Sequence, residues 1–486
     1  MNFYHLLQSY ASRSPERVLF VEQHSGGTLT SRDALAVCEA LRKKFEHLRG
    51  ERIALVMRND PLYLIVLIAL WSVGCVPVLI PTRWLEAQQQ DVIHELGCSG
   101  VVTLSDAQAW SSRVCLHRCD GVRVSAGYTG EAPALVMFTS GSTGQPKAVP
   151  LTWCNLESSM QQFYRGLRLD HTLTVAAVAP LYHGAGLLTL TLPLFALGAK
   201  VVTLPRFDVD LLARAVHEEG VDAVFMVPTM WQRTCASDAF AQGKFDTLRV
   251  ALTGGARTAL PVLQAWHQRG VELVVGYGMT ESSPAGTFAH AEHWSLNPLS
   301  VGVSDALLRF KIVNANEDGV GQIALRGLNL MMGYLVYKQW ENVFCCDKAC
   351  FDDEGYFLSP DVGRMENTQL VLLGRMDDVI NSGGEKISPD EVEAALEEVM
   401  PDVRWCVVGV PDEEWGEVVT AFYVGPRELD VLVIRRALEG VLPGYKAPRM
   451  VLRCEDFPVG ATGKVDRRAL ITYVHQGHVN SGISAA

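Results

Sequence analysis

The residues 139–147 combine hydroxyls, glycines and one lysine directly after an apolar stretch. Glycines permit the positive-φ turns that aim successive backbone N–H groups at one anion, hydroxyls add donors, and lysine adds a positive charge. This composition predicts a phosphate-binding loop; a flexible Ser/Gly surface loop is the alternative. The spacing differs from the ordinary P-loop, because Gln145 and Pro146 separate the lysine from the last glycine. The candidate ligands are Thr139, Ser140, Gly141, Ser142, Thr143, Gly144 and Lys147.

Two further segments follow apolar runs that read as buried strands. Tyr277, Gly278, Thr280 and Glu281 come directly after one such run, at the strand end where α/β sheets collect ligands. An aromatic face beside glycine suits a flat base, and a carboxylate near phosphates suits Mg²⁺. A solvated acid in a first helical turn is the alternative for Glu281. The segment 252–256 ends the other run in Gly254, Gly255 and Ala256, where a planar ring could lie against the bare backbone or the chain could simply turn.

Four more polar residues stand in settings that could serve a ligand. His183 lies among small and apolar residues, as part of an organic acid's pocket wall or as a buried structural histidine. Asp361 could accept hydrogen bonds from two vicinal ribose hydroxyls and Arg375 could donate in a fixed fork, although a surface salt bridge would use the same pair. Lys464 stands between small residues and a charged tail, which would also fit an exposed basic turn.

The elements that position these residues alternate between short β-branched runs and helical patterns. Strands are expected at 52–56, 100–103, 135–138, 174–178, 223–227 and 273–275, which predicts an α/β fold of layered, mainly parallel sheets. From about Val301 shorter strands with turns predict a β-rich subdomain, at 310–313, 322–325 and 370–373. After Arg375 a compact α+β unit begins anew, with a helix capped by Ser388, strands at 405–410, 418–424 and 449–453, and a helix at 430–442.

One uncharged segment, 61–82, is nearly long enough to span a membrane. Gly74, Pro77 and Pro81 divide it, which predicts a buried helix, a turn and a short strand instead. Residues 187–204 repeat this arrangement of buried helix and strand.

The bulk properties describe an ordinary globular chain. A length of 486 residues suggests two to four domains, and a net charge of -12 argues against non-specific binding to nucleic acid or anionic membranes. The twelve cysteines include no Cys-x-x-Cys pair and the first ten residues show no signal peptide, so free thiols and a cytoplasmic location are expected.

Taken in order, these motifs resemble the adenylate-forming superfamily of acyl-CoA synthetases, aryl-acid ligases, luciferases and peptide-synthetase adenylation domains. The resemblance runs from near Arg52 to Arg468. It implies an AMP-binding core domain over 1–374, a hinge over 375–378 centred on Asp377, and a small mobile lid domain over 379–486.

The resemblance also implies roles for the candidate residues. The 139–147 loop would hold the β- and γ-phosphates of ATP, and Glu281 with Thr143 would hold Mg²⁺. Gly254, Gly255 and Tyr277 would sandwich adenine, while Asp361 and Arg375 would fix the ribose. Ala256, Gly278 and Thr280 would also belong to the nucleotide-binding set. Lys464 would stabilise the charge that develops during adenylation, with His183 beside the acid. Rotation about Asp377 would then bring Gly383 and Gly384 to the entrance for a thiol.

The sequence departs from the commonest family pattern at Pro360, Ala148 and Asn381, none of which removes a catalytic group. Pro360 restricts the loop before the ribose aspartate. Members that activate amino acids usually carry an aspartate near His183, and this chain has none there, which favours an acid without an α-amino group. The mostly apolar pocket wall expected from Val227, Trp231, Gly276, Gly278 and Ser283 suits an aryl or medium acyl acid.

The resulting functional prediction is an ATP-dependent acid:CoA ligase that forms an acyl-adenylate, with ATP, Mg²⁺ and CoA as cofactors. A ligase that loads the acyl group onto the phosphopantetheine of a carrier protein is the close alternative. A nucleotide-binding protein without turnover, or a kinase-like NTPase, is the alternative of another class.

Overall fold

The computed structural model describes residues 2–119, 128, 131–140, 146–304, 306–338, 343–383, 385–460 and 464–475. Five of the predicted site residues, Gly141, Ser142, Thr143, Gly144 and Gly384, lie outside the described residues.

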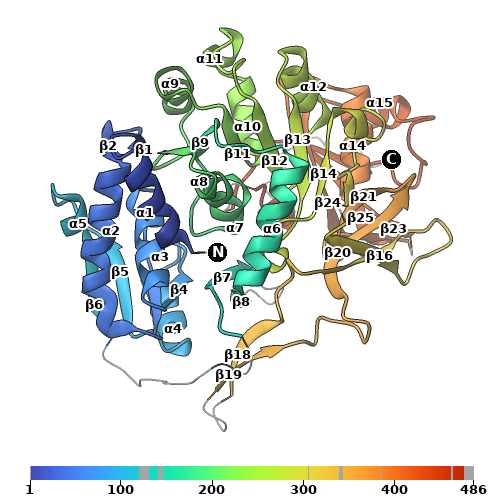
Figure 1. Cartoon of the computed structure of the whole chain (residues 1–486). Helices are drawn as coiled ribbons and strands as arrows, with labels where there is room; N and C mark the ends of the chain where they lie inside the picture. Colours follow the sequence, from blue (N-terminus) through green and yellow to red (C-terminus); the bar gives the residue numbers. More distant parts are fainter. Residues whose placement is uncertain are drawn as a thin grey trace.

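Two large mixed sheets carry the first 300 residues (Figure 1). In the nine-stranded sheet the inner strands run parallel, while β2, β14 and β15 pair antiparallel at its edges. Its order is β15 (Val303–Ser304), β14 (Thr287–Ala289), β13 (Leu273–Tyr277), β12 (Val250–Gly254), β11 (Ala223–Met226), β9 (Thr174–Ala177), β10 (Lys200–Thr203), β1 (Val18–Glu22) and β2 (Gly27–Thr30).

In the six-stranded sheet, antiparallel β6 and β8 flank four parallel strands. Its order is β6 (Val114–Arg118), β5 (Gly100–Leu104), β3 (Arg52–Leu55), β4 (Val76–Leu79), β7 (Leu135–Ser140) and β8 (Pro146–Leu151). The predicted α/β class with mainly parallel sheets is confirmed.

Helices separate most of these strands along the chain, as the alternating pattern predicts. They are α1 (Phe3–Arg13), α2 (Ser31–Phe45), η1 (Glu46–Leu48), α3 (Leu62–Ser72), α4 (Glu86–Glu95), α5 (Trp110–Arg113), α6 (Trp153–Gly166), α7 (Gly184–Gly186), η2 (Leu187–Thr191), α8 (Leu192–Ala196), α9 (Val209–Glu219), α10 (Pro228–Cys235), α11 (Asp238–Ala241), α12 (Leu260–Gln268), η3 (Thr280–Ser282) and α13 (Ala291–Trp294).

The uncharged segment 61–82 forms the predicted buried helix and strand. Every residue of α3 from Leu62 to Leu70 is buried in the main core, and β4 follows a turn at Gly74. Across the described ranges, each helix falls short of the length and apolarity that a bilayer crossing requires.

The second apolar segment forms the predicted buried helix and strand, with one irregularity. The chain forms a π-helical stretch, η2, before α8 begins. Pro193 has no N–H to donate to the Thr189 carbonyl and its ring crowds that carbonyl, so the regular α-helical bonding is interrupted at this turn. The Thr189 and Thr191 hydroxyls donate instead to the carbonyls of Ala185 and Gly186.

Residues beyond 305 form the predicted β-rich subdomain. It consists of the antiparallel sheet β16 (Leu308–Val313), β17 (Gly321–Gly327), β20 (Phe357–Glu366) and β21 (Gln369–Arg375), with the hairpin β18 (Tyr334–Lys338) and β19 (Val343–Asp347). The hairpin reaches back to the large domain, since β18 contacts β8.

The C-terminal unit has apolar cores of its own. Its elements are β22 (Ile380–Ser382), β23 (Glu385–Ile387), α14 (Pro389–Val399), β24 (Arg404–Asp412), β25 (Gly416–Val424), α15 (Val431–Ala437), β26 (Met450–Arg453) and α16 (Arg467–His475). The Ser388 side chain caps α14 as predicted. The helix predicted over 430–442 is shorter, because Gly440 adopts a positive φ of 84° and Pro443 follows.

We expect Thr152→Ala to lower the apparent unfolding temperature by about 1–3 °C, measured by a thermal scan. Thr152 and Asn155 form a reciprocal capping box at the start of α6, and both side chains are buried there. Thr152→Ser keeps the hydroxyl acceptor and is the matched control. An equal loss in both variants would contradict the capping role.

Candidate active site

Two glycines stand side by side where parallel strands β12 and β13 end. Gly254 and Gly276 are register partners, and a Cβ on Gly254 would lie 2.6 Å from the Gly276 carbonyl oxygen. Gly255 follows with a φ of +86°, a conformation that glycine adopts without strain. The predicted bare backbone surface is therefore present, with exposed Ala256 at its end.

A group of polar side chains lies next to this surface. The Tyr277 hydroxyl donates to Asp361 Oδ2 at 2.8 Å, and Asp361 pairs with Arg375 across the antiparallel strands β20 and β21. Burial first, and then Asp361, raise the pKa of Tyr277. Burial also raises the pKa of Asp361, against the lowering effect of Tyr277 and Arg375. The structure thus brings these three predicted residues together.

Pro360 is accommodated by an irregularity in β20. The register between β17 and β20 shifts between Gln322 and Ala324, opposite the stretch that contains Pro360. Ser359 is fully buried there, donating to the Ile323 carbonyl and accepting from the Asp361 amide at 3.1 Å. At a bulge the proline does not have to donate a backbone N–H to the neighbouring strand. This departure from the family pattern therefore leaves Asp361 in position.

Lys464 reaches this group from the C-terminal unit. Its Cε lies 3.3 Å from the position that a Cβ on Gly255 would occupy. Desolvation of the ammonium, followed by repulsion from Arg375, lowers the pKa of Lys464, while Asp361 acts in the opposite direction. The lysine therefore faces the strand ends that carry the glycines and the Asp361–Arg375 pair.

His183 precedes α7 and belongs to the same electrostatic neighbourhood. Burial lowers the pKa of His183 to about 4, and the charges of Lys464 and Arg83 add to this effect. The imidazole is consequently neutral at ordinary pH.

Glu281 is a buried carboxylate in η3, and it has a partner that the sequence did not reveal. The Tyr334 hydroxyl donates to Glu281 Oε1 at 2.8 Å. Lys147 Nζ lies 4.8 Å from the centroid of the Tyr334 ring, within cation–π range. Burial raises the pKa of Glu281. Tyr334 therefore links the predicted metal carboxylate to the predicted phosphate lysine, and no motif spacing marks it.

The described ends of the 139–147 loop meet across a hairpin, where Thr139 pairs with Lys147 between β7 and β8. Within the described residues, no group of three or more His, Cys, Asp or Glu side chains could enclose a metal ion. A single buried carboxylate fits Mg²⁺ in its usual nucleotide setting, where one or two carboxylates and phosphate oxygens share the ion. Glu281 thus fits this ion, and Thr143 lies outside the described residues.

The predicted pocket residues have their polar atoms engaged within the protein. Ser283, with a φ of 53°, donates to the Asn329 carbonyl, and Trp231 donates to the Leu252 carbonyl while packing against Trp266. A Cβ on Gly278 would lie 1.9 Å from the Pro284 carbonyl oxygen. Val227, which precedes α10, is also buried. Trp231 and Ser283 are fully buried, and the role of these residues as a pocket wall stays a prediction.

Two predicted residues lie on the C-terminal side. Asp377 stands between β21 and β22, after a backbone bond from Met376 to the Pro360 carbonyl. Gly383 adopts a φ of +60° and donates to the Trp415 carbonyl. Their roles as hinge and thiol entrance stay predictions.

Two protein-family models match this chain, one over the core domain and one over the C-terminal unit. The model "AMP-binding enzyme" matches residues 7–335, and "AMP-binding enzyme C-terminal domain" matches residues 391–464. The chain belongs to the AMP-binding enzyme family. The predicted adenylate-forming superfamily is confirmed.

Curated relatives extend the similarity over most of the chain. A feruloyl-CoA synthase from Amycolatopsis sp is 31% identical over 439 residues, which cover 86% of this chain and 87% of that protein. A 2-succinylbenzoate–CoA ligase from Bacillus mycoides is 28% identical, with 95% of each chain covered. An indoleacetate–CoA ligase from Aromatoleum aromaticum is 31% identical and covers 69% of this chain and 66% of its own length.

Solved structures share the fold at lower identity. ATP-bound MatB from Rhodopseudomonas palustris has a TM-score of 0.80 and 21% identity, with 97% and 98% of the two chains covered. The o-succinylbenzoate CoA synthetase MenE from Bacillus subtilis, in complex with the acyl-adenylate intermediate OSB-AMP, has a TM-score of 0.77 and 23% identity, with 96% and 97% covered. Both support the two-part α/β architecture.

We expect Tyr334→Phe to raise the KM for ATP·Mg²⁺ about 3- to 10-fold, because Glu281 loses a hydroxyl donor worth about 1 kcal/mol. The ring facing Lys147 is retained, so Tyr334→Leu should be more severe. Steady-state kinetics with varied nucleotide measures both. Tyr445→Phe removes a hydroxyl from an exposed ring and is the control; a KM unchanged by Tyr334→Phe would refute the role.

His183 should make folding stability depend on pH. Its folded-state pKa of about 4 lies below the ordinary 6.5, so the unfolded chain takes up a proton before the folded chain does. Stability from this residue is complete above pH 6.5 and falls as the pH drops toward 4. Unfolding temperatures at pH 7.5 and 5 should therefore differ less in His183→Gln than in the unmodified protein. If the two proteins show the same difference in unfolding temperature, the folded and unfolded states protonate this imidazole at the same pH.

Proposed function

We propose that this protein is an AMP-forming acid–thiol ligase, which activates a carboxylic acid with ATP and transfers the acyl group to CoA. The observation that carries the proposal is the approach of Lys464, from the C-terminal unit, to Gly255 and to the charges of Asp361 and Arg375 in the core. A cation delivered to the end of a nucleotide-binding sheet is suited to phosphoryl chemistry.

In the first step a carboxylate oxygen of the acid attacks the α-phosphorus of ATP. The bond from this phosphorus to the bridging oxygen breaks, and pyrophosphate leaves with the electron pair. Lys464 neutralises the charge that develops on the α-phosphate and the attacking carboxylate, while Lys147 holds the leaving group. Mg²⁺, held by Glu281, supplies further neutralisation of the phosphate oxygens when bound.

The nucleoside would lie along the strand ends. Adenine would lie between the Gly254–Gly255 backbone and Tyr277, with Ala256, Gly278 and Thr280 in the neighbouring segments. Asp361 and Arg375 would receive the ribose hydroxyls, because Asp361 has acceptor oxygens and Arg375 has donors at the same register position.

The acid is proposed to be aromatic and without an α-amino group. Residues 180–186 around His183 contain no carboxylate that could pair with an ammonium, and the predicted pocket wall offers carbon surface. Relatives named for ferulate, indoleacetate and 2-succinylbenzoate support an aromatic acid in preference to a medium acyl chain.

In the second step the thiolate of CoA attacks the acyl carbon, a C–S bond forms, and AMP leaves. The C-terminal unit, residues 379–486, would turn about the 375–378 hinge, withdrawing Lys464 and presenting Gly383 and Gly384 to the pantetheine arm. The 1–374 core would stay in place.

ATP–pyrophosphate exchange with a panel of carboxylic acids tests the first step. Trapping of the activated acyl group with CoA, or with a phosphopantetheinyl carrier protein, tests the acceptor. Exchange that depends on an aromatic acid, followed by CoA thioester formation, supports the proposal. Transfer to the carrier protein alone would favour a carrier-loading ligase, and exchange with no acid would favour a nucleotide-binding protein without turnover.

We expect Lys464→Ala to slow adenylation about 10²- to 10³-fold, because one preorganised charge is removed from the transition state. Thioester formation from supplied acyl-adenylate should remain near its original rate. Rapid-quench measurements of the two half-reactions provide the comparison. An equal decrease in both rates would contradict a role confined to the first step.

A further inference from the structure

One face of α14 carries three acids that are almost completely buried. Asp390, Glu393 and Glu397 recur at three- and four-residue spacing, which places them on one side of the helix, and their exposed fractions are 7%, 6% and 5%. Desolvation raises the pKa of Glu393, so its ionised form depends on nearby cations. Buried carboxylates of this kind need charged partners.

The first partner comes from the core domain. Arg257 lies in the loop between β12 and α12, two residues beyond Gly255. Its Nη1 lies 2.9 Å from Glu397 Oε2 and its Nη2 lies 2.5 Å from Glu397 Oε1, a forked contact. The same Nη2 is 3.4 Å from Glu393 Oε2, and the Leu260 amide also donates to Glu397.

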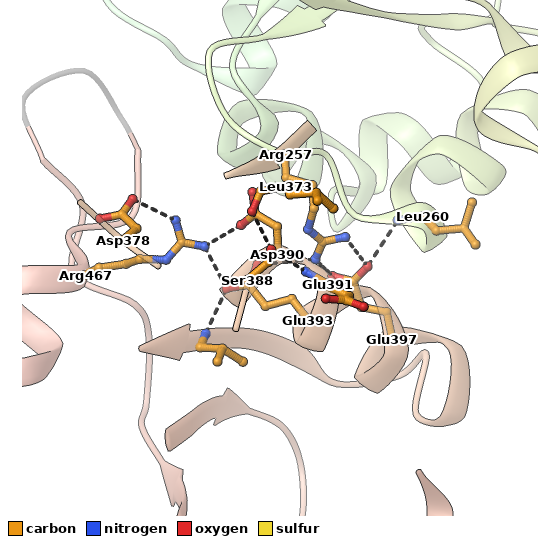
Figure 2. Close-up of polar contacts among 11 residues, drawn as sticks. Arg257, Leu260, Leu373, Asp378, Ser388, Asp390, Glu391, Glu393, Glu397 and Arg467 are labelled. Atoms are coloured by element: carbon orange, nitrogen blue, oxygen red, sulfur yellow. Dashed lines mark hydrogen bonds and ion pairs between the residues drawn. The ribbon is translucent and has the colours of Figure 1, made fainter. Parts of the chain in front are cut away.

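The second partner comes from the C-terminal unit itself. Arg467 Nη2 lies 2.8 Å from Asp390 Oδ1 and 2.9 Å from Glu393 Oε1. Figure 2 shows acids of α14 in contact with Arg257, on the ribbon of the core, and with Arg467. Glu393 is therefore shared by an arginine of each domain.

This cluster connects the nucleotide turn with the catalytic lysine. Arg467 begins α16, three residues after Lys464, while Arg257 follows the Gly254–Gly255 turn against which Lys464 rests. The Arg467 contacts lie within one unit and can persist in any domain orientation. The Arg257 contacts join two units and exist only where α14 lies against the loop after β12.

We infer that Arg257 is a positioning residue for adenylation, which holds the C-terminal unit in the orientation that brings Lys464 to the core through its pairing with Glu393 and Glu397. The inference rests on the proposed two-step function. The ion pairs of Arg257 must break before the C-terminal unit turns for the thioester step. Their strength therefore sets the balance between the two half-reactions.

The direct test is Arg257→Ala, measured separately in the two half-reactions. We expect the rate of ATP–pyrophosphate exchange with the active acid to fall about tenfold, because a smaller fraction of molecules has Lys464 in place. Thioester formation from supplied acyl-adenylate should keep its rate or increase. Arg257→Lys, which retains the charge without the fork, should lie between the two.

Arg269→Ala is the matched control. Arg269 forms a forked pair with Asp246 within the core, and both side chains are partly exposed. It should leave both half-reactions unchanged. A double variant, Arg257→Ala with Glu397→Gln, should lose no more exchange activity than Arg257→Ala alone, because the two residues act through one contact.

Hydrogen exchange of the unliganded protein gives a readout that needs no acid. Peptides covering 257–268 and 389–399 should exchange faster in Arg257→Ala than in the unmodified protein, with no change in Arg269→Ala. If this holds while no acid supports pyrophosphate exchange, the proposed enzyme function fails and the domain contact stands. Equal decreases in the rates of both half-reactions, or unchanged hydrogen exchange in these peptides, would overturn the role of Arg257.

Discussion

The parallel pairing of β12 with β13 is the constraint on which the candidate site depends. Because adjacent parallel strands end at the same sheet edge, the pairing aligns Gly254 with Gly276 and leaves no room for a side chain between them. The chain leaving β12 then supplies Gly255 and Arg257, and the chain leaving β13 supplies Tyr277 and Glu281. Three other elements contact residues of this edge. Asp361 accepts a hydrogen bond from Tyr277, Tyr334 donates one to Glu281, and Glu397 of α14 accepts one from Arg257.

Desolvation acts on both signs of charge at this edge. It raises the pKa of Glu281 and Asp361, and it lowers the pKa of Lys464 and His183. Each shift favours the neutral form of its group. A phosphate close to Lys464 would favour the ammonium instead, and a magnesium ion on Glu281 would favour the carboxylate. If the proposed roles hold, the charged forms that adenylation needs would be stabilised together with the substrate, and nucleotide binding would favour the ammonium form of Lys464.

Much of this arrangement could be predicted from local sequence signals. Strand positions, the buried helix at 62–72 and the glycines at strand ends follow from apolar runs and their breakers, which report local structure. For Asp361 and Arg375, the sequence could not decide between a ribose site and a surface salt bridge. Their relative position depends on strand register, and register across a bulge has no local signature in the sequence.

The residues that sequence reasoning missed act across long separations. Tyr334 lies 53 positions from Glu281, and Arg257 lies 140 positions from Glu397. Neither belongs to a motif, since each is selected by the approach of two separately folded elements. The π-helical stretch before Pro193 was missed for a different reason: the apolar pattern of 187–199 is the same for α and π geometry, and only the threonine hydroxyls and the proline distinguish them.

The distribution of apolar and charged contacts suits the proposed change in orientation of the C-terminal unit. Among the described residues, each apolar cluster of the C-terminal unit stays within residues 380–474, and the main core ends at Leu372. Cohesion inside each domain is thus apolar, while the contact between them at α14 uses charges. A buried ion pair gains little net free energy, because the cost of desolvation offsets most of the attraction, yet it tolerates only one geometry. An apolar interface of the same size would stabilise the orientation that brings Lys464 to the core more, and would define that orientation less sharply. Under the proposed two-step function, the charged contact would favour a defined orientation for the first reaction without making that orientation too stable to leave.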